Sequence, residues 1–194
     1  MGELLPVCRV GIVGAECSGK TCLARALAGE FDVPWVPELL REFCDLQGRP
    51  PRAKEQRELM REQIWRESQA LKQASEHGAS FLICDCTPLV TALYSQVLFE
   101  DESLLLEARA HQTAYRVTLL TDVDIDWKPD GIQRDGEAAR SRFDQVLRDR
   151  LRQYRIAHTL ITGKPLDRLA KAKQVLRDLR DLPPAAVAYT HGSR

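Results

Sequence analysis

Short, almost wholly apolar segments alternate along this chain with longer segments of helical periodicity. The apolar segments read as strands and cover 7–14, 33–36, 81–84, 117–120 and 159–162. Amphipathic helices are predicted over 21–30, 53–77, from about 88, over 104–111, 139–154 and 167–182. Strands that are apolar throughout and separated by helices are typical of a parallel sheet covered on both faces. The pattern therefore predicts an α/β fold, with five parallel strands between two layers of helices.

Length and hydropathy favour one domain. At 194 residues the chain is long enough for one full core, since domains average ~150 residues. No repeat or linker marks a second unit, so we expect one domain over 1–182 and a flexible polar tail over 183–194. The longest charge-free stretch, 86–99, is shorter than the ~20 residues of a membrane helix. The N-terminus lacks the pattern of a secretory signal, which predicts a cytoplasmic protein.

Charge and cysteine usage exclude several classes of partner. The 28 basic residues balance the 28 acidic ones, so no net charge draws the chain to nucleic acid or membrane. Acidic residues interleave with the arginines of 134–155, which favours a solvated helix face with i,i+4 ion pairs for most of them. The six cysteines form no C-x-x-C pair, and buried reduced thiols are expected rather than zinc ligands or disulfides.

The strongest chemical signal is a G-x-x-x-x-G-K-[ST] phosphate loop between a strand and a helix, Gly14-Ala15-Glu16-Cys17-Ser18-Gly19-Lys20-Thr21. Its glycines let backbone N–H groups wrap around phosphate oxygens, and the helix N-terminus adds positive charge. Lys20 is predicted to contact the β- and γ-phosphates, and Thr21 to offer its hydroxyl to Mg²⁺. The loop and the following Cys22 are therefore expected to bind a nucleoside triphosphate, ATP, with Mg²⁺.

Asp85 ends the third predicted strand, where P-loop proteins place a carboxylate that supports Mg²⁺. In the alternative interpretation Asp85 caps the helix that begins near Pro88, at the same edge of the sheet. The chain has no room for the helical subdomain of AAA motors, and 162–167 does not spell a guanine-recognition motif. That segment resembles the loop that packs beside adenine in nucleotide and nucleoside kinases, with Gly163 against the nucleotide. A small-molecule kinase is the class that fits.

Two further segments suit a kinase. Glu38 and Arg41 follow the second strand, where a carboxylate can take the proton of an attacking hydroxyl and an arginine can hold an oxyanion. Glu38 is the predicted base, with Asp85 as its competitor. Between strands four and five, about 127–142, an arginine segment flanked by glycines predicts a lid. Its Arg134 and Arg140 are expected to neutralise the transferring group and exclude water.

Together, four stretches resemble the NadR-type ribosylnicotinamide kinase domain and its relatives among small AAA-like ATP-binding proteins: 14–21, 37–43, 84–95 and 124–136. The resemblance covers about residues 8–180. It implies a P-loop kinase-like three-layer fold and ATP-dependent phosphorylation of the ribose 5′-hydroxyl of nicotinamide riboside. It also implies substrate contacts, beside those of Glu38 and Arg41, by Gln63, Thr87, Trp127 and Asp130. For Gln63, a solvated helix position is the alternative.

The chain departs from that family pattern at three places. Thr87 stands where the family has the second Asp of D-T-D, Arg134 comes one position later than the arginine of G-L-R, and Asp126 replaces a proline before the tryptophan. These departures leave the acceptor open. The alternatives are a kinase of another nucleoside or vitamin alcohol, and an ATPase switch without an acceptor. A small molecule is the expected partner, with neither nucleic acid nor membrane, and a homo-oligomer is left open.

Overall fold

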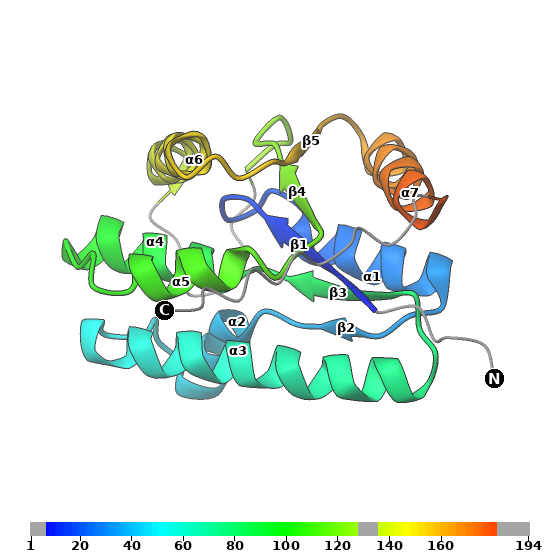
Figure 1. Cartoon of the computed structure of the whole chain (residues 1–194). Coiled ribbons are helices and arrows are strands. Elements are labelled where there is room, and N and C mark those ends of the chain that lie inside the picture. The colour runs from blue at the N-terminus through cyan, green and yellow to red at the C-terminus, as the bar shows by residue number, and fades with distance from the viewer. Residues whose placement is uncertain (1–6, 128–135, 182–194) are drawn as a thin grey trace, which may run out of the picture.

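The computed structural model describes residues 7–127 and 136–181. A five-stranded sheet forms its centre, in the order β2-β3-β1-β4-β5, and every neighbouring pair is parallel (Figure 1). The strands are β1 Cys8–Val13, β2 Trp35–Val36, β3 Phe81–Asp85, β4 Val117–Thr121 and β5 Thr159–Ile161. The predicted parallel sheet is confirmed, although β2 is two residues shorter than the expected 33–36.

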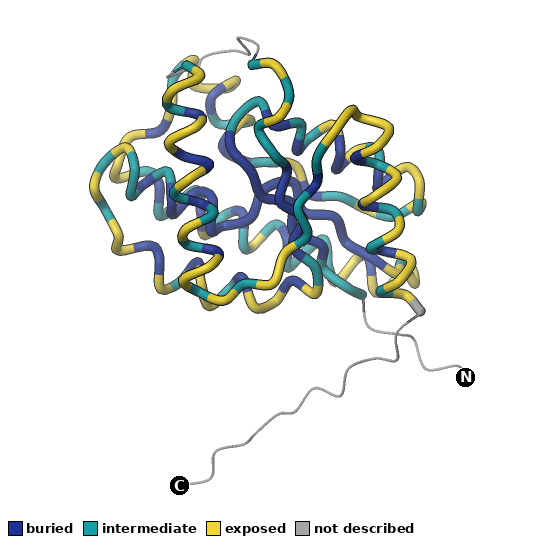
Figure 2. The backbone as a smooth tube through the Cα atoms, turned by 90° about the horizontal axis from the view of Figure 1, so that it is seen from above, coloured by how far each residue is buried: buried dark blue, intermediate teal, exposed yellow. Residues whose placement is uncertain are grey.

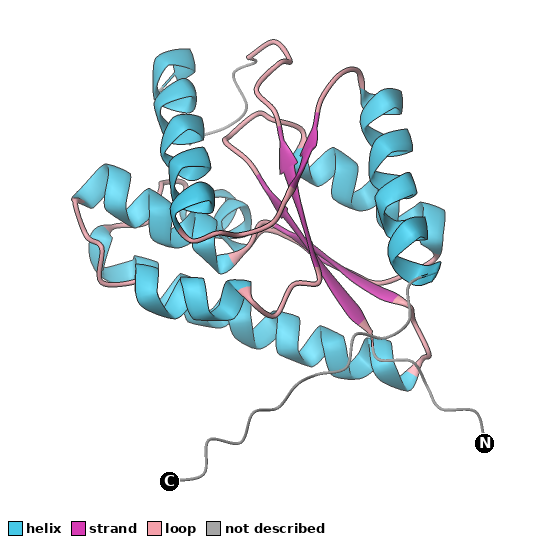
Figure 3. Cartoon of the chain, turned by 45° about the horizontal axis from the view of Figure 1, so that its top comes forward, coloured by secondary structure: helices cyan, strands magenta, loops and turns pink. Residues whose placement is uncertain are grey.

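Helices cover both faces of this sheet (Figure 3). On one face lie α1 Lys20–Phe31 and α7 Pro165–Asp181. On the other lie α3 Ala53–Glu76, α4 Pro88–Phe99, α5 Leu105–Gln112 and α6 Gly136–Gln153. A further helix, α2 Leu39–Gln47, packs beside α3. The predicted three-layer α/β/α architecture is therefore confirmed.

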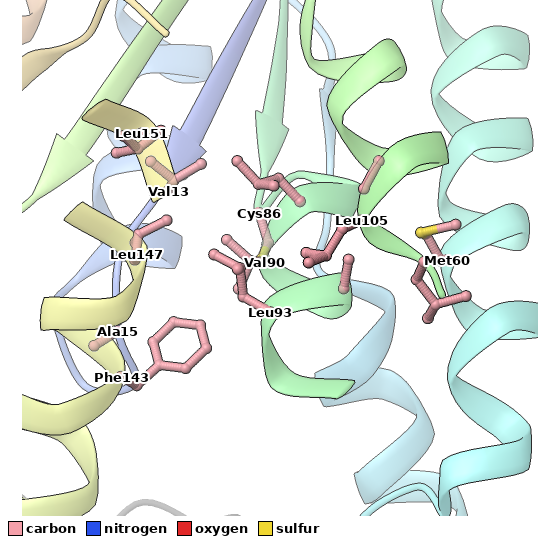
Figure 4. Packing of buried hydrophobic residues seen from close by; sticks show 14 of the residues in the cluster. Val13, Ala15, Met60, Cys86, Val90, Leu93, Leu105, Phe143, Leu147 and Leu151 are labelled. Atoms are coloured by element: carbon pink, nitrogen blue, oxygen red, sulfur yellow. The ribbon is translucent and has the colours of Figure 1, made fainter. Parts of the chain in front are cut away.

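The strands are buried on both sides, which explains their nearly unbroken apolar sequences (Figure 2). Successive side chains of a strand point to opposite faces, so one strand supplies two cores. Val10 and Ile12 of β1 pack with the α1 and α7 side. Val13 packs with Leu93 of α4 and Leu147 of α6 (Figure 4). Among the described residues, no helix is long and apolar enough to cross a membrane.

Helix α2 was not predicted from the sequence. It buries only Leu39, Leu40 and Cys44 within nine residues, which is too short a stripe to stand out as helical periodicity. Helix α6 begins at Gly136, three residues before the predicted 139. The first part of the predicted lid, 128–135, and the predicted tail, 183–194, lie outside the described residues.

The arginines of α6 follow two patterns. Arg148 forms an i,i+4 ion pair with Asp144 at 2.6 Å, as expected for a charged helix face, and Arg150 pairs with Glu102 of the α4–α5 loop at 2.7 Å. The exception is Arg140, which is only 4% exposed. All six cysteines are reduced, and three of them, Cys44, Cys84 and Cys86, are buried.

Candidate active site

Four segments that are far apart in the sequence meet at one edge of the sheet, around a cavity of about 950 Å³. They are the phosphate loop with the start of α1, the start of α2, the segment after β4, and the loop between β5 and α7. The residues that line the cavity are Cys17, Ser18, Gly19, Lys20, Thr21, Cys22, Arg25, Glu38, Arg41, Asp124, Ile125, Asp126, Gly163, Lys164 and Pro165. The segments predicted for phosphate, acceptor and adenine thus share one cavity.

The phosphate loop is tied closely to β4. A Cβ atom on Gly14 would lie 2.1 Å from Oγ1 of Thr121 and 2.7 Å from Oγ of Ser18. The Ser18 hydroxyl donates to the Ala15 carbonyl at 2.7 Å and lies 2.7 Å from the Thr121 hydroxyl oxygen. At the other end of the loop, Gly19 has φ +82°, which favours glycine. Both glycines of the motif are therefore required by the backbone path around the site.

We expect Gly14→Ala to weaken ATP–Mg²⁺ binding by about tenfold or more, because the added methyl must displace Thr121 or the loop. Overpacking of this kind typically costs about 1–3 kcal/mol in stability. Calorimetric titration and thermal unfolding would measure both effects. Gly29→Ala is the matched control: nothing lies within 4 Å of its Cβ position on α1, so it should raise stability slightly and leave affinity unchanged. Parental ATP affinity in Gly14→Ala would contradict the steric account.

Lys20 lies inside the site rather than at its rim. Its side chain is 7% exposed, and Nζ donates to the Ala15 carbonyl at 2.9 Å. Burial alone lowers the pKa of Lys20, but the carboxylates of Glu38 and Asp85 outweigh it and raise that pKa above its ordinary value. The ammonium group is therefore charged at neutral pH, next to the two carboxylates that the sequence singled out.

Asp85 is an unsatisfied buried carboxylate. It is 1% exposed, and neither carboxylate oxygen has a hydrogen-bond partner among the described residues. Burial, and then the neighbouring Glu38, raise its pKa to about 6, against the opposing effects of the Thr21 hydroxyl, Lys20 and Arg41. Burying a carboxylate without a partner is costly, and a bound cation would relieve that cost.

These groups fit Mg²⁺. The Asp85 carboxylate and the Thr21 hydroxyl are hard oxygen donors, which this ion prefers, and it commonly completes its shell with phosphate oxygens and water. Within the ranges 7–127 and 136–181, no group of three or more His, Cys, Asp or Glu residues is gathered as a metal cage. The donor set therefore suits an ion that is carried mainly by the nucleotide.

Two predicted substrate contacts lie elsewhere. Gln63 is buried in α3, where its Oε1 accepts from Leu39 N at 3.1 Å and its Nε2 donates to Glu67 at 3.2 Å. Thr87 is 1% exposed, and its hydroxyl donates to Gln112 at 2.9 Å. Neither residue lines a cavity described here, because the amide and the hydroxyl are both used inside the protein. The substrate contacts of Gln63 and Thr87 stay predictions. The solvated alternative for Gln63 is wrong, because this residue is only 4% exposed.

Arg140 supports the segment after β4. Its Nη2 donates to the carbonyls of Val123 and Ile125 at 2.9 and 3.0 Å. Its Nε and Nη1 are buried without a partner in the described part of the chain. The side chain is thus anchored at the base of the predicted lid, and its Nε and Nη1 groups remain available as hydrogen-bond donors. Whether it contacts the transferring phosphoryl group stays a prediction.

Three other predicted residues belong to the lid entry. Asp130 and Arg134 lie outside the described residues, and their roles stay predictions. Trp127 is the last described residue before that gap. Its indole Nε1 is buried, and no acceptor for it lies within the described ranges. Trp127 lines neither cavity, so its contact with a substrate also stays a prediction.

A second cavity of about 370 Å³ lies between α4 and α6, next to the phosphate loop. It is lined by Glu16, Tyr94, Val97, Leu98, Ala138, Ala139, Arg140, Arg142 and Phe143. The rings of Tyr94 and Phe143 stack with centroids 4.0 Å apart and an interplanar angle of 15°. Sequence reasoning missed both aromatic residues, because apolar positions of amphipathic helices read as core.

Arg168 of α7 was also missed, and it joins three loops of the main cavity. It is 4% exposed, and its guanidinium donates to the carbonyls of Ser18 at 2.6 Å, Gly163 at 2.7 Å and Asp122 at 3.0 Å. It also pairs with Asp124, whose carboxylate accepts from Gly163 N at 2.6 Å. In the sequence, Arg168 looks like any basic residue on a charged helix.

Comparisons with known proteins agree with this architecture. The model of a AAA domain family matches residues 9–168. No curated protein matches the chain in sequence.

Solved structures of low sequence identity share the fold. A NadR protein in complex with NR has a TM-score of 0.74 at 15% identity over 96% of this chain, and another in complex with NAD and AMP-PNP has 0.72 at 16% over 95%. The chain spans only 55% and 52% of those two proteins. A deoxyadenosine kinase from M. mycoides has a TM-score of 0.57 at 12% identity, over 88% of this chain and 99% of its own.

Proposed function

Because the chain belongs to this AAA domain family, we propose that it is an ATP-dependent kinase of a nucleoside-like alcohol. Nicotinamide riboside, phosphorylated on its ribose 5′-hydroxyl, is the leading candidate acceptor. The observation that carries the proposal is the position of Glu38: it lines the cavity over the phosphate loop and acts electrostatically on both Lys20 and Asp85. A carboxylate at this place can orient an attacking hydroxyl group and accept its proton. The NR and nucleotide complexes of the fold neighbours support the same substrate class.

The roles follow from the chemistry of phosphoryl transfer, in which positioning and charge stabilisation dominate. Backbone N–H groups of the loop bind the phosphates, and Lys20 places its positive charge on the oxygens of the transferring group. Mg²⁺, held through Thr21 and Asp85, would neutralise phosphate charge when bound. Glu38 orients the acceptor hydroxyl and takes its proton as the new P–O bond forms, while the bond from the γ-phosphorus to the bridging oxygen breaks and ADP leaves.

The second cavity suits the remainder of the acceptor. It adjoins the phosphate loop at Glu16, and its apolar wall includes the stacked rings of Tyr94 and Phe143. A planar base packs well against such rings. The unpartnered donors of Arg140 suit an oxygen acceptor carried by that base, for example a carboxamide.

Glu38→Gln is expected to keep ATP–Mg²⁺ affinity and to lose phosphoryl transfer by at least ~10²-fold, because the amide keeps the shape of the side chain but cannot take the proton. Initial rates of nucleoside monophosphate formation would measure the loss of transfer, and calorimetry would measure the affinity for ATP. Glu42→Gln is the control: Glu42 of α2 pairs with Arg66 of α3 away from the cavity, so the change should not affect transfer. Normal transfer in Glu38→Gln, with loss in Asp85→Asn at retained ATP binding, would move the base to Asp85.

A coupled kinase assay over nucleosides, deoxynucleosides and vitamin alcohols tests the proposal itself. Nicotinamide riboside should give the highest kcat/KM, with one phosphate transferred for each ATP consumed. A higher value for another nucleoside would keep the kinase and change the acceptor. Phosphate release that no compound of the panel accelerates would reject the kinase in favour of an ATPase switch.

A further inference from the structure

The first turn of α2 takes its cap from another helix. Glu38 is the N-cap residue, yet its side chain makes no capping hydrogen bond. Instead, the N–H of Leu39 donates to Oε1 of Gln63 in α3 at 3.1 Å. An N-cap side chain normally satisfies the exposed N–H groups of its own helix. Gln63 satisfies the N–H of the first helical residue and so fixes the start of α2, while the Glu38 side chain makes no capping bond and lines the cavity that holds Lys20.

The orientation of Gln63 is set by Glu67, one turn further along α3. A glutamine amide has a donor end and an acceptor end of nearly equal size, so packing alone does not choose between its two flipped states. A carboxylate only accepts. The Gln63 Nε2 donates to Oε1 of Glu67 at 3.2 Å, which leaves the carbonyl end of Gln63 to face Leu39 N.

Glu67 is itself held from the far side. It is fully buried, and its Oε2 accepts from the Tyr115 hydroxyl at 2.6 Å and lies 3.2 Å from Nε2 of His111. Removing a carboxylate from water is costly, and apolar residues would fill the same volume without that cost. A continuous line of hydrogen bonds thus runs from Tyr115 and His111, through Glu67 and Gln63, to the residue next to Glu38.

We propose that Glu67 and Gln63 are positioning residues, which fix the first turn of α2 so that the Glu38 carboxylate faces the acceptor. The inference rests on the proposed role of Glu38 in transfer. Gln63 is 4% exposed, Glu67 is fully buried, and neither lines the cavity around Lys20. On this proposal both residues act through Glu38. A positioning role then differs from a merely structural one, because its effect on transfer depends on Glu38.

Gln63→Leu removes the acceptor of Leu39 N while keeping most of the volume. We expect the Leu39 amide to exchange with solvent at least about tenfold faster, as an unprotected helix end does. We also expect kcat for the acceptor to fall about tenfold or more, with ATP–Mg²⁺ affinity unchanged. In a Glu38→Gln background, Gln63→Leu should lower kcat no further, because the group it positions is already inactive.

An exchange of the two side chains keeps the network intact. In the double variant Gln63→Glu with Glu67→Gln, the new glutamine donates to the new glutamate and still accepts from Tyr115. The new glutamate accepts from Leu39 N. In the single variant Gln63→Glu, the new carboxylate instead lies against the buried carboxylate of Glu67. We expect the single variant to lose acceptor turnover and the double variant to recover most of it.

The inference is overturned if Gln63→Leu leaves Leu39 exchange unchanged, if it lowers kcat by the same factor in the parent and in the Glu38→Gln background, or if the exchanged pair recovers nothing. Failure of the proposed function looks different: then no acceptor is phosphorylated by the parent, or Glu38→Gln transfers normally. Amide exchange at Leu39 is measured without any phosphoryl acceptor. This measurement therefore decides the capping role of Gln63 in either case.

Discussion

Lys20→Met should lower phosphoryl transfer by about 10³-fold or more, the largest single loss expected for this chain. A preorganised cationic donor on the transferring group is worth several kcal/mol in a site of low dielectric, and methionine keeps the volume of the lysine stem without its charge. The variant also removes a buried positive charge that interacts with the carboxylates of Glu38 and Asp85. Single-turnover rates at saturating ATP would report the effect on transfer separately from any loss of nucleotide affinity.

Lys72→Met is the matched control for this variant. Lys72 is exposed on α3, and replacing it should change neither transfer nor stability by a measurable amount. Near-parental transfer by Lys20→Met would remove the phosphate loop from the mechanism altogether.

Asp85→Asn should have opposite effects on activity and stability. We expect a loss of Mg²⁺-dependent transfer of about 10³-fold, because the amide is a poor ligand for a hard cation. We also expect the unliganded protein to gain about 1–3 kcal/mol in unfolding free energy near pH 7. The gain arises because the buried carboxylate has no hydrogen-bond partner in the described residues and its pKa is raised to about 6, which makes its charged form costly in the folded state.

The pH dependence of that gain has a definite sign. The folded protein binds a proton at Asp85 more tightly than the unfolded chain does, so the penalty in the parent is absent below about pH 4, near the ordinary carboxyl pKa of 3.8. It grows as the pH rises and is complete above about pH 6. Unfolding curves of parent and variant should therefore converge at low pH. A difference that does not depend on pH would show that burial of the charge is not its cause, and Asp178→Asn, on the exposed face of α7, should show none.

The sequence predicts those parts of the site that depend on local backbone geometry. Gly14, Gly19 and Lys20 are spaced by the path of one loop, and Asp85 follows from the end of one buried strand, so motif and periodicity are enough to place them. The roles of Gln63 and Arg168 depend on which backbone groups other segments bring within reach. Their partners lie 24 residues away at Leu39 N and 150 residues away at the Ser18 carbonyl. No local pattern records contacts of that kind.

The buried guanidinium of Arg168 has a consequence for how ATP is bound. The three loops that surround the nucleotide side of the cavity are already tied together by its hydrogen bonds to Ser18, Gly163 and Asp122. The conformational entropy of ordering them is therefore lost when the chain folds and is not lost again on binding. The proposed nucleotide half of the site is therefore preorganised before any ligand binds. We expect a nucleotide to bind there with little rearrangement of these three loops.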